Sequence, residues 1–149
     1  MSGGAILMSI RPQYVDRMIS GDKSVELRRR RPKHMGNGTI VLIYASRPVG
    51  LIMGAFKVDH LVEKPKEQLW REVRKKAGVT REEFERYFSG VANGVGIFFS
   101  SFRRLPEPIR PESSGSNGIQ IHPPQSYRYV QLDDFNLKSY AIFGDAPLI

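Results

Sequence analysis

The stretch SGDKSVELR, residues 20–28, decides most of what the sequence predicts about this chain. It begins as a turn around Gly21 and then alternates between polar and apolar residues, which is typical of a half-buried strand. Val25 and Leu27 are predicted to face the core. Lys23 directly follows the turn, so we expect its ammonium group to project into a cleft. The opposite face of the strand is predicted to carry the polar residues Ser24, Glu26 and Arg28.

Basic residues continue directly from this strand. Residues 11–33 hold eight basic and three acidic side chains, and so carry five of the chain's eight net positive charges. One interpretation is a solvated face that keeps the protein in solution. We favour a second interpretation, because a concentrated positive field attracts polyanions such as nucleic acids. The residues then expected to hold phosphates are Arg28, Arg29, Arg30, Arg31 and Lys33.

Length and composition restrict the class of protein. The 149 residues, of which 40% are apolar, fit one compact domain over 1–149 with a weakly patterned tail at 133–149. There is no cysteine, which excludes disulfides and thiolate metal sites, and the three histidines lack metal-ligand spacing, so we expect no metal and no cofactor. The chain shows no signal peptide and no run of ~20 apolar residues, which predicts a cytoplasmic protein outside the membrane.

The remaining pattern predicts an α+β fold. The expected strands are 6–10, 24–28, 39–45, 51–62, 95–102 and a last one ending at Val130. The expected helices are one that starts at Arg11-Pro12, one at 66–77, and one capped by Thr80 with Glu83 in a capping box. Residues 105–118 are expected to form a loop, and 119–121 to rejoin the sheet. Because the strands are short and numerous, we expect a small mixed β-barrel decorated with short helices.

Two further segments carry groups suited to nucleic acid. Ser46 and Arg47 follow the strongest strand, where binding loops are common, although spacing alone favours an ordinary turn. Pro123 and Pro124 fix the backbone ahead of hydrogen-bonding residues and a ring that can stack on a base. The structural interpretation of this second segment is a corner in which its tyrosines pack. The candidate residues after the prolines are Gln125, Ser126, Tyr127 and Arg128.

Together these motifs resemble the ASCH superfamily, whose fold is a PUA-like barrel. The resemblance rests on the pattern Gly-x-Lys-x-x-Glu-x-Arg, which residues 21–28 match at every fixed position, and it extends in order over roughly residues 6–130. Residues 43–50, the paired helices and residues 123–128 resemble a subgroup described as predicted transcriptional regulators. The resemblance therefore implies the fold over most of the chain.

The resemblance implies a nucleic-acid-binding module, for RNA more than for DNA, or for a nucleoside ligand. A role in transcription or RNA metabolism would follow from it. Phosphates would be held by Arg28, Arg29, Arg30, Arg31, Lys33, Arg47 and Arg128. Ser126 would be a further contact for the ligand. A base, modified or flipped out of its stack, would be enclosed by Lys23, Ser24, Glu26, Ser46, Gln125 and Tyr127.

An enzymatic function is also implied by the same resemblance. Some small family members that resemble this chain around Lys23 are 4-acetylcytidine amidohydrolases, which use a lysine, a following threonine and a distant glutamate. The corresponding catalytic residues here would be Lys23 and Ser24, since serine keeps the hydroxyl. The expected place of the glutamate, near Ala77, holds no carboxylate, so binding is favoured over catalysis. Carboxylates that could replace it are Glu67, Glu72 and Glu82.

A ribonuclease and a protein-binding module are also compatible with the sequence. Some family members are ribonucleases, and a metal-independent ribonuclease would use Lys23 with Tyr127 or Tyr44, while Arg28 would stabilise the charge that develops on the phosphate. In a protein-binding module, the helices at 66–89 would contact a partner in transcription. Their outer face carries charges of both signs, which argues against insertion into a DNA major groove.

Overall fold

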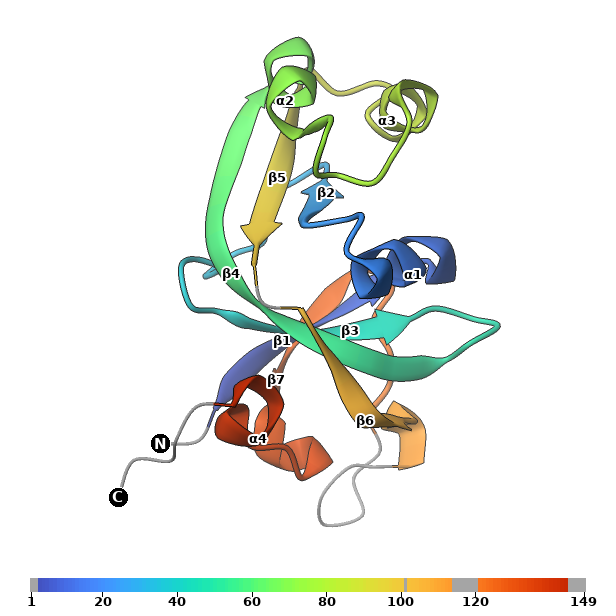
Figure 1. Cartoon of the computed structure of the whole chain (residues 1–149), viewed down its shortest axis with the longest axis vertical. Coiled ribbons are helices and arrows are strands. Elements are labelled where there is room, and N and C mark those ends of the chain that lie inside the picture. Colours follow the sequence, from blue (N-terminus) through green and yellow to red (C-terminus); the bar gives the residue numbers. More distant parts are fainter. Residues whose placement is uncertain (1–2, 101, 114–120, 145–149) are drawn as a thin grey trace.

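The computed structural model describes residues 3–100, 102–113 and 121–144 (Figure 1). The strands in this part of the chain are β1 (Gly4–Ile10), β2 (Val25–Arg28), β3 (Ile40–Ala45), β4 (Leu51–Pro65), β5 (Asn93–Phe99), β6 (Arg103–Ile109) and β7 (Tyr127–Gln131). The α-helices are α1 (Pro12–Ser20), α2 (Lys66–Val73), α3 (Arg81–Tyr87) and α4 (Ser139–Phe143). No helix within the described ranges is long and apolar enough to cross a bilayer.

A single sheet runs through the molecule in the order β2-β5-β4-β3-β1-β7, and β6 pairs with β4 beside this path. β1 and β3 are parallel, whereas the remaining neighbouring pairs are antiparallel. The long strand β4 joins the two halves of the sheet, because it pairs first with β3 and β6 and then with β5. Its register against β5 shifts between Val58 and His60, and the strand curves along its length (Figure 1).

The sheet does not close into the barrel that the sequence predicts. Among the described residues, β2 pairs only with β5 and β7 only with β1, so these two strands are the ends of the sheet. A barrel needs an unbroken ladder around its circumference. β2 ends after four residues, where the basic segment 29–33 leaves the strand. The α+β class is correct, and a gap remains between β2 and the edge formed by β1 and β7.

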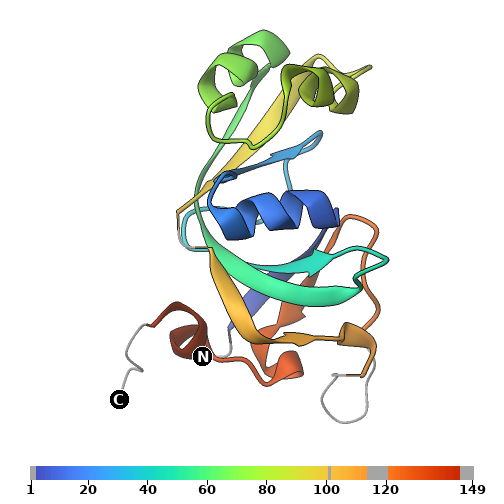
Figure 2. The same cartoon turned by 45° about the vertical axis from the view of Figure 1, so that its right-hand side comes forward.

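Three apolar clusters hold the elements around this gap. The central cluster packs α1 against the sheet through Val15 and Met18, and Figure 2 shows α1 between β2 and the lower strands. The second cluster lies on the opposite face of β1 and β3 and includes Phe143 of α4. The third packs α2 and α3 on β5, so closely that a Cβ at Gly94 would lie 2.6 Å from the Phe88 ring. Burying a phenylalanine such as Phe88 stabilises the fold by roughly 1.5–3 kcal/mol.

The predicted loop at 105–118 is wrong in its first part, because Arg103–Ile109 forms β6. Two prolines in this segment favour a loop, but β6 pairs only with β4 among the described strands, and an edge strand tolerates proline. Ile121, which was expected to rejoin the sheet, is buried but belongs to no strand. The predicted segments 114–118 and 119–120 lie outside the described residues.

The C-terminal tail contains more structure than its sequence pattern predicts. Leu132–Phe135 forms a 3₁₀ turn, and α4 follows it. Phe135 and Phe143 are both buried in the second cluster, so this tail closes one face of the sheet. Residues 145–149 of the predicted tail lie outside the described residues.

Candidate functional site

A cavity of about 540 Å³ lies at the gap between β2 and the edge of β1. Its walls come from β2, α1, α3, the end of β1 and residues of the connecting segments. We call it the ion-pair cavity, because the buried ion pair of Lys23 and Glu26 lies in its wall. Its polar and charged lining residues are Ser9, Arg11, Tyr14, Lys23, Glu26, Arg28, Arg29, Ser46, Glu83, Arg86, Tyr87 and Gln125.

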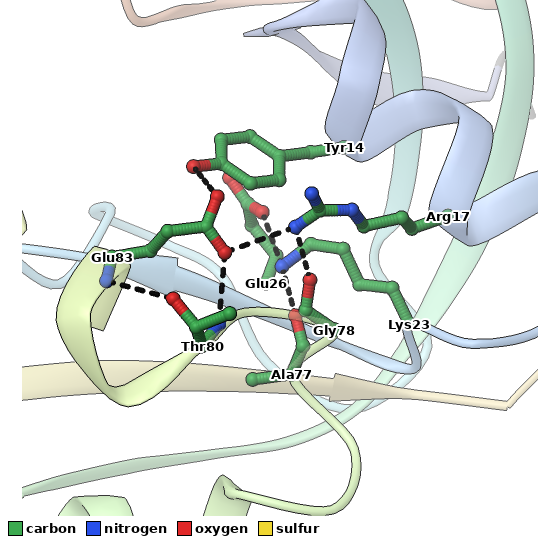
Figure 3. Close-up of polar contacts among 8 residues, drawn as sticks. All are labelled: Tyr14, Arg17, Lys23, Glu26, Ala77, Gly78, Thr80 and Glu83. Atoms are coloured by element: carbon green, nitrogen blue, oxygen red, sulfur yellow. Dashed lines mark hydrogen bonds and ion pairs between the residues drawn. The ribbon is translucent and has the colours of Figure 1, made fainter.

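Lys23, Glu26 and Arg28 form a buried cluster of charges in the wall of this cavity. Lys23 Nζ lies 3.5 Å from Glu26 Oε1, and Arg28 Nη2 lies 3.1 Å from Glu26 Oε2. The Lys23, Glu26 and Arg28 side chains are 2%, 9% and 14% exposed. Lys23 also donates a 2.7 Å hydrogen bond to the Ala77 carbonyl (Figure 3). A charge withdrawn from water persists only when it is paired, so the two cations jointly compensate the burial of Glu26.

The sequence predicts that the Lys23 ammonium group projects into a cleft, and Lys23 does line the cavity. The loop between α2 and α3 explains why this side chain is also buried. The Ser24 backbone N–H donates to the Lys76 carbonyl at 2.7 Å, which holds this segment against the loop. Gly78 then passes directly over Lys23, and a Cβ on Gly78 would lie 2.8 Å from Lys23 Cβ. Gly78 also has a positive φ of 62°, which favours glycine.

Burial lowers the pKa of Lys23 below its ordinary value of 10.5. The Glu26 carboxylate opposes this shift, while the positive charges of Arg17 and Arg28 add to it. The loss of hydration dominates because Glu26 is shared with Arg28 and compensates Lys23 only in part. Lys23 therefore releases a proton more readily than a surface lysine.

A second polar cluster, centred on Glu83 of α3, lies beside the first (Figure 3). Tyr14 Oη donates to Glu83 Oε2 at 3.4 Å, and Arg17 Nη1 lies 3.2 Å from Glu83 Oε1. The same Arg17 nitrogen donates to the Gly78 carbonyl at 2.6 Å. The backbone hydrogen bond from Thr80, assisted by Arg17, lowers the pKa of Glu83. Glu83 is thus an ionised group, whereas burial and the nearby Glu83 charge raise the pKa of Tyr14.

Sequence reasoning assigned Glu83 to a capping box and missed its place in the cavity. The box is confirmed, since Thr80 Oγ1 accepts from Glu83 N at 3.1 Å and Thr80 N donates to Glu83 Oε1 at 2.8 Å. The capping motif could locate the residue but not its neighbour Arg17, which lies on another helix. None of the three carboxylates expected as possible partners of the lysine lines the cavity: Glu67 pairs with Arg81, Glu72 pairs with Lys64, and Glu82 is not among the lining residues.

Arg28 spans the gap between the two ends of the sheet. Its Nη2 donates to the Ser9 carbonyl of β1 at 2.9 Å, and its Nη1 donates to Ser126 Oγ at 3.4 Å. Its Nε is buried without a hydrogen-bond partner among the described residues. The planar guanidinium carries five donors, so one side chain can serve several acceptors. Arg28 thus connects β2 with the edge formed by β1 and β7 through side-chain hydrogen bonds, whereas a closed barrel would connect them through a ladder of backbone hydrogen bonds.

A second cavity, of about 610 Å³, adjoins the first, because Arg28, Arg29 and Tyr87 line both. We call it the basic groove, since none of the described residues that line it is acidic. The Lys33 backbone N–H donates to Tyr127 Oη at 3.4 Å, and Tyr129 Oη donates to the Lys33 carbonyl, so β7 holds the basic segment in place. The groove is lined by Arg28, Arg29, Arg30, Arg31, Pro32, Lys33, Tyr87, Val91, Ser126 and Tyr127.

The structure brings eleven of the fourteen predicted site residues to these two cavities. Three lie elsewhere. Ser24 is half-buried and lines neither cavity. Arg47 is exposed beside Glu112 at 4.0 Å, and Arg128 donates to the His122 carbonyl at 3.2 Å. Tyr44, which was expected as a possible group for cleavage, is buried in the second apolar cluster. The residues in place are Lys23, Glu26, Arg28, Arg29, Arg30, Arg31, Lys33, Ser46, Gln125, Ser126 and Tyr127.

No group of three His, Asp or Glu side chains within the described ranges is arranged to hold a metal ion. The groups that the ion-pair cavity does offer are suited to acid–base and electrostatic roles. A lysine with a lowered pKa, two ionisable carboxyl groups and several guanidinium groups can bind, orient and exchange protons with a polar ligand.

Comparison with known proteins identifies relatives along most of the chain. A curated relative from Zymomonas mobilis subsp. mobilis, named ASCH domain-containing ribonuclease, is 27% identical over 131 residues, which cover 86% of this chain and 85% of the relative. The crystal structure of ASCH from Zymomonas mobilis superimposes with a TM-score of 0.77 at 24% identity, covering 87% of this chain and 90% of that one. A tyrosine-to-phenylalanine variant of that protein gives the same TM-score at 23% identity, with 87% and 92% coverage.

These similarities establish the fold and the family. At such identities the solved structures indicate a shared fold, and none of the relatives named above is called a transcriptional regulator. The model of the ASCH domain matches residues 8–99, which is more than half of the chain and includes Lys23, Glu26, Arg28 and Glu83. The chain belongs to the ASCH domain family.

Proposed function

We propose that the protein binds RNA, with a nucleobase, modified or unmodified, in the ion-pair cavity. The observation that carries this proposal is the cavity itself: a buried Lys23–Glu26–Arg28 cluster beside the hydrogen-bonding groups of Ser46 and Gln125. Bases offer both donors and acceptors at their edges, and an enclosed polar pocket can satisfy both. The adjoining basic groove supplies positive charge for the phosphates.

The family and the relative named as a ribonuclease favour RNA over DNA as the partner. A role in RNA metabolism follows from this proposal. The transcriptional role expected from the subgroup has no observation in its favour. The mixed charges on α2 and α3, which include Glu67 paired with Arg81 and Glu72 paired with Lys64, offer little attraction for a duplex.

The test of RNA binding is the affinity of the purified chain for a labelled RNA oligonucleotide at low salt, measured by fluorescence anisotropy. Arg28→Gln is expected to weaken binding roughly 5- to 150-fold, because it removes a charged group worth ~1–3 kcal/mol from both cavities. Arg103→Gln is the matched control, since Arg103 is an exposed arginine that lines neither cavity. Absence of RNA binding by the wild type, or equal losses in the two folded variants, would show the proposal to be wrong.

RNA cleavage is a second candidate function, and the ribonuclease name of the relative favours it. In the reaction that needs only groups of the chain, the ribose 2′-oxygen attacks the phosphorus and the bond to the 5′-oxygen breaks. The 2′-hydroxyl proton goes to a base, and an acid gives a proton to the leaving 5′-oxygen. Lys23 is suited to proton exchange, while Arg28 and Arg29 are suited to stabilise the negative charge on the phosphate. The position of Ser24 outside the cavity weighs against the amidohydrolase form of catalysis.

Cleavage is tested with the same RNA by gel analysis in the presence of EDTA. We expect a 2′,3′-cyclic phosphate product, and Lys23→Met is expected to slow its formation about 100-fold or more, which is typical for loss of a proton-transfer group. Lys75→Met, a change at an exposed lysine outside the cavity, is the control. Cleavage of an oligonucleotide that lacks every 2′-hydroxyl, or an unchanged rate in folded Lys23→Met, contradicts this second candidate.

A further inference from the structure

The two cavities divide their charges in different ways, although they share a wall. The ion-pair cavity has Glu26 and Glu83 among its cations, so its charge is partly balanced. The basic groove has five cations and no acidic residue among the described residues of its lining. Arg28, Arg29 and Tyr87 separate the two. A neutral base edge suits the first environment, and phosphates suit the second.

Two of the five cations in the basic groove are available to a ligand. Within the described residues, neither Arg30 nor Arg31 has a hydrogen-bond or ion-pair partner, and both are exposed. Their backbone is held nevertheless at Lys33, whose N–H and carbonyl are hydrogen-bonded to the Tyr127 and Tyr129 hydroxyl groups. On the other side of the pair, the Arg29 side chain donates to the Ser89 carbonyl at 3.2 Å. A fixed backbone that presents unpaired guanidinium groups is preorganised for anions, which reduces the entropy lost on binding.

Aromatic rings flank the same groove. Tyr87 is an exposed ring on the wall between the cavities. Tyr127 also lines the groove, but it is half-buried, packs against the central apolar cluster and lies edge-on to Tyr129 at 6.0 Å. Stacking of an unpaired base on an exposed ring such as that of Tyr87 is worth about 1–3 kcal/mol and occurs with any base. Rings and unpaired cations together are typical of surfaces that bind single strands.

We propose that the ligand is single-stranded RNA of at least two nucleotides, with one base in the ion-pair cavity and the adjoining nucleotide in the basic groove. This inference rests on the proposed function. The volumes of about 540 and about 610 Å³ are each in the range of a small-molecule site, about 300–1,000 Å³. A base can enter the first cavity only after it leaves its stack and its pair, and this costs a duplex a few kcal/mol. The protein should therefore prefer a longer single strand to a mononucleotide and to a duplex.

The experiment compares three kinds of probe by competition: the four ribonucleoside monophosphates, a mixed-sequence tetranucleotide, and a blunt duplex. For the wild type we expect the tetranucleotide to bind about tenfold more tightly than any monophosphate, which corresponds to ~1.4 kcal/mol for the second nucleotide. The double variant Arg30→Gln/Arg31→Gln is expected to lose this advantage, because the tetranucleotide places an additional nucleotide against these two arginines and the monophosphates do not. The double variant Arg103→Gln/Arg104→Gln, which removes the same charge from β6, is expected to keep both.

The outcomes separate this inference from the proposed function. Equal wild-type affinity for monophosphates and tetranucleotide overturns the inference and leaves RNA binding intact. A duplex that binds as tightly as the tetranucleotide, or an advantage for length that survives in Arg30→Gln/Arg31→Gln, overturns it as well. Failure of every RNA probe to bind overturns the proposed function, and this inference with it.

Discussion

Lys23 shows how a single residue is stabilised where its charge is costly. Its ammonium group is withdrawn from water, and an isolated buried charge would cost several kcal/mol. Three contacts offset this cost: the Ala77 carbonyl at 2.7 Å, the Glu26 carboxylate at 3.5 Å and the face of the Tyr14 ring at 5.4 Å. A surface lysine would be stable without such an arrangement. A buried ion pair of this kind is weak evidence for a contribution to stability, which makes the cluster a candidate for a functional role.

The burial of Lys23 makes stability depend on pH in a predictable direction. Its pKa in the folded chain lies below the ordinary value of 10.5, so between these two values the unfolded chain binds more protons. The free energy of unfolding contributed by this residue therefore rises as pH increases through that window. Lys23→Met removes the titrating group, so we expect the difference in stability between wild type and variant to shift in favour of the wild type from neutral to alkaline pH.

Urea denaturation of both proteins across this pH range measures the effect. Lys75→Met serves as the control, because Lys75 is exposed in the turn after α2. The free energy of unfolding of this control should change with pH in the same way as that of the wild type. If the free energy of unfolding of Lys23→Met also changes with pH as that of the wild type does, burial does not lower the pKa of Lys23.

The secondary-structure elements show which features a sequence can predict. β1, α1, β2, β3 and β4 follow local patterns of alternation, helical spacing and terminating glycines, and the sequence predicts each of them within a few residues. The α3 capping box is likewise a local motif, so Thr80 and Glu83 could be assigned before any tertiary contact was known. Such signals lie in neighbouring residues and need no long-range information.

The features that sequence reasoning missed depend on distant contacts. Glu26 was expected on a polar strand face, yet it is buried in the wall of the cavity that β2 forms with α1 and α3. Glu83 is paired with Arg17, which lies 66 positions away in the chain. β6 has unfavourable local sequence, but pairing with β4 overrides the propensity of its prolines. In each case tertiary packing outweighs the local preference.

The molecule as a whole places its candidate site where its sheet stays open. β2 and β7 end the sheet, Arg28 reaches across the gap, and both cavities lie along it. A closed ladder would fill this space with backbone hydrogen bonds and leave no room for a ligand. The expected barrel and the candidate site therefore exclude one another at this position, and the open edge is what makes a binding cavity available.

The distribution of charge over the whole molecule leads to a prediction about salt. The net charge of +8 acts over the entire surface, whereas the proposed contacts with phosphates are confined to the basic groove. Each phosphate neutralised on a single strand contributes about 0.7 to the slope of log K against log salt concentration, so Arg30→Gln/Arg31→Gln should reduce the magnitude of that slope by about 1.4. Arg103→Gln/Arg104→Gln lowers the net charge by the same two units and should leave the slope unchanged. Anisotropy titrations over a series of salt concentrations give both slopes, and an equal reduction in the two double variants would mean that RNA is attracted by the overall charge and not held in the groove.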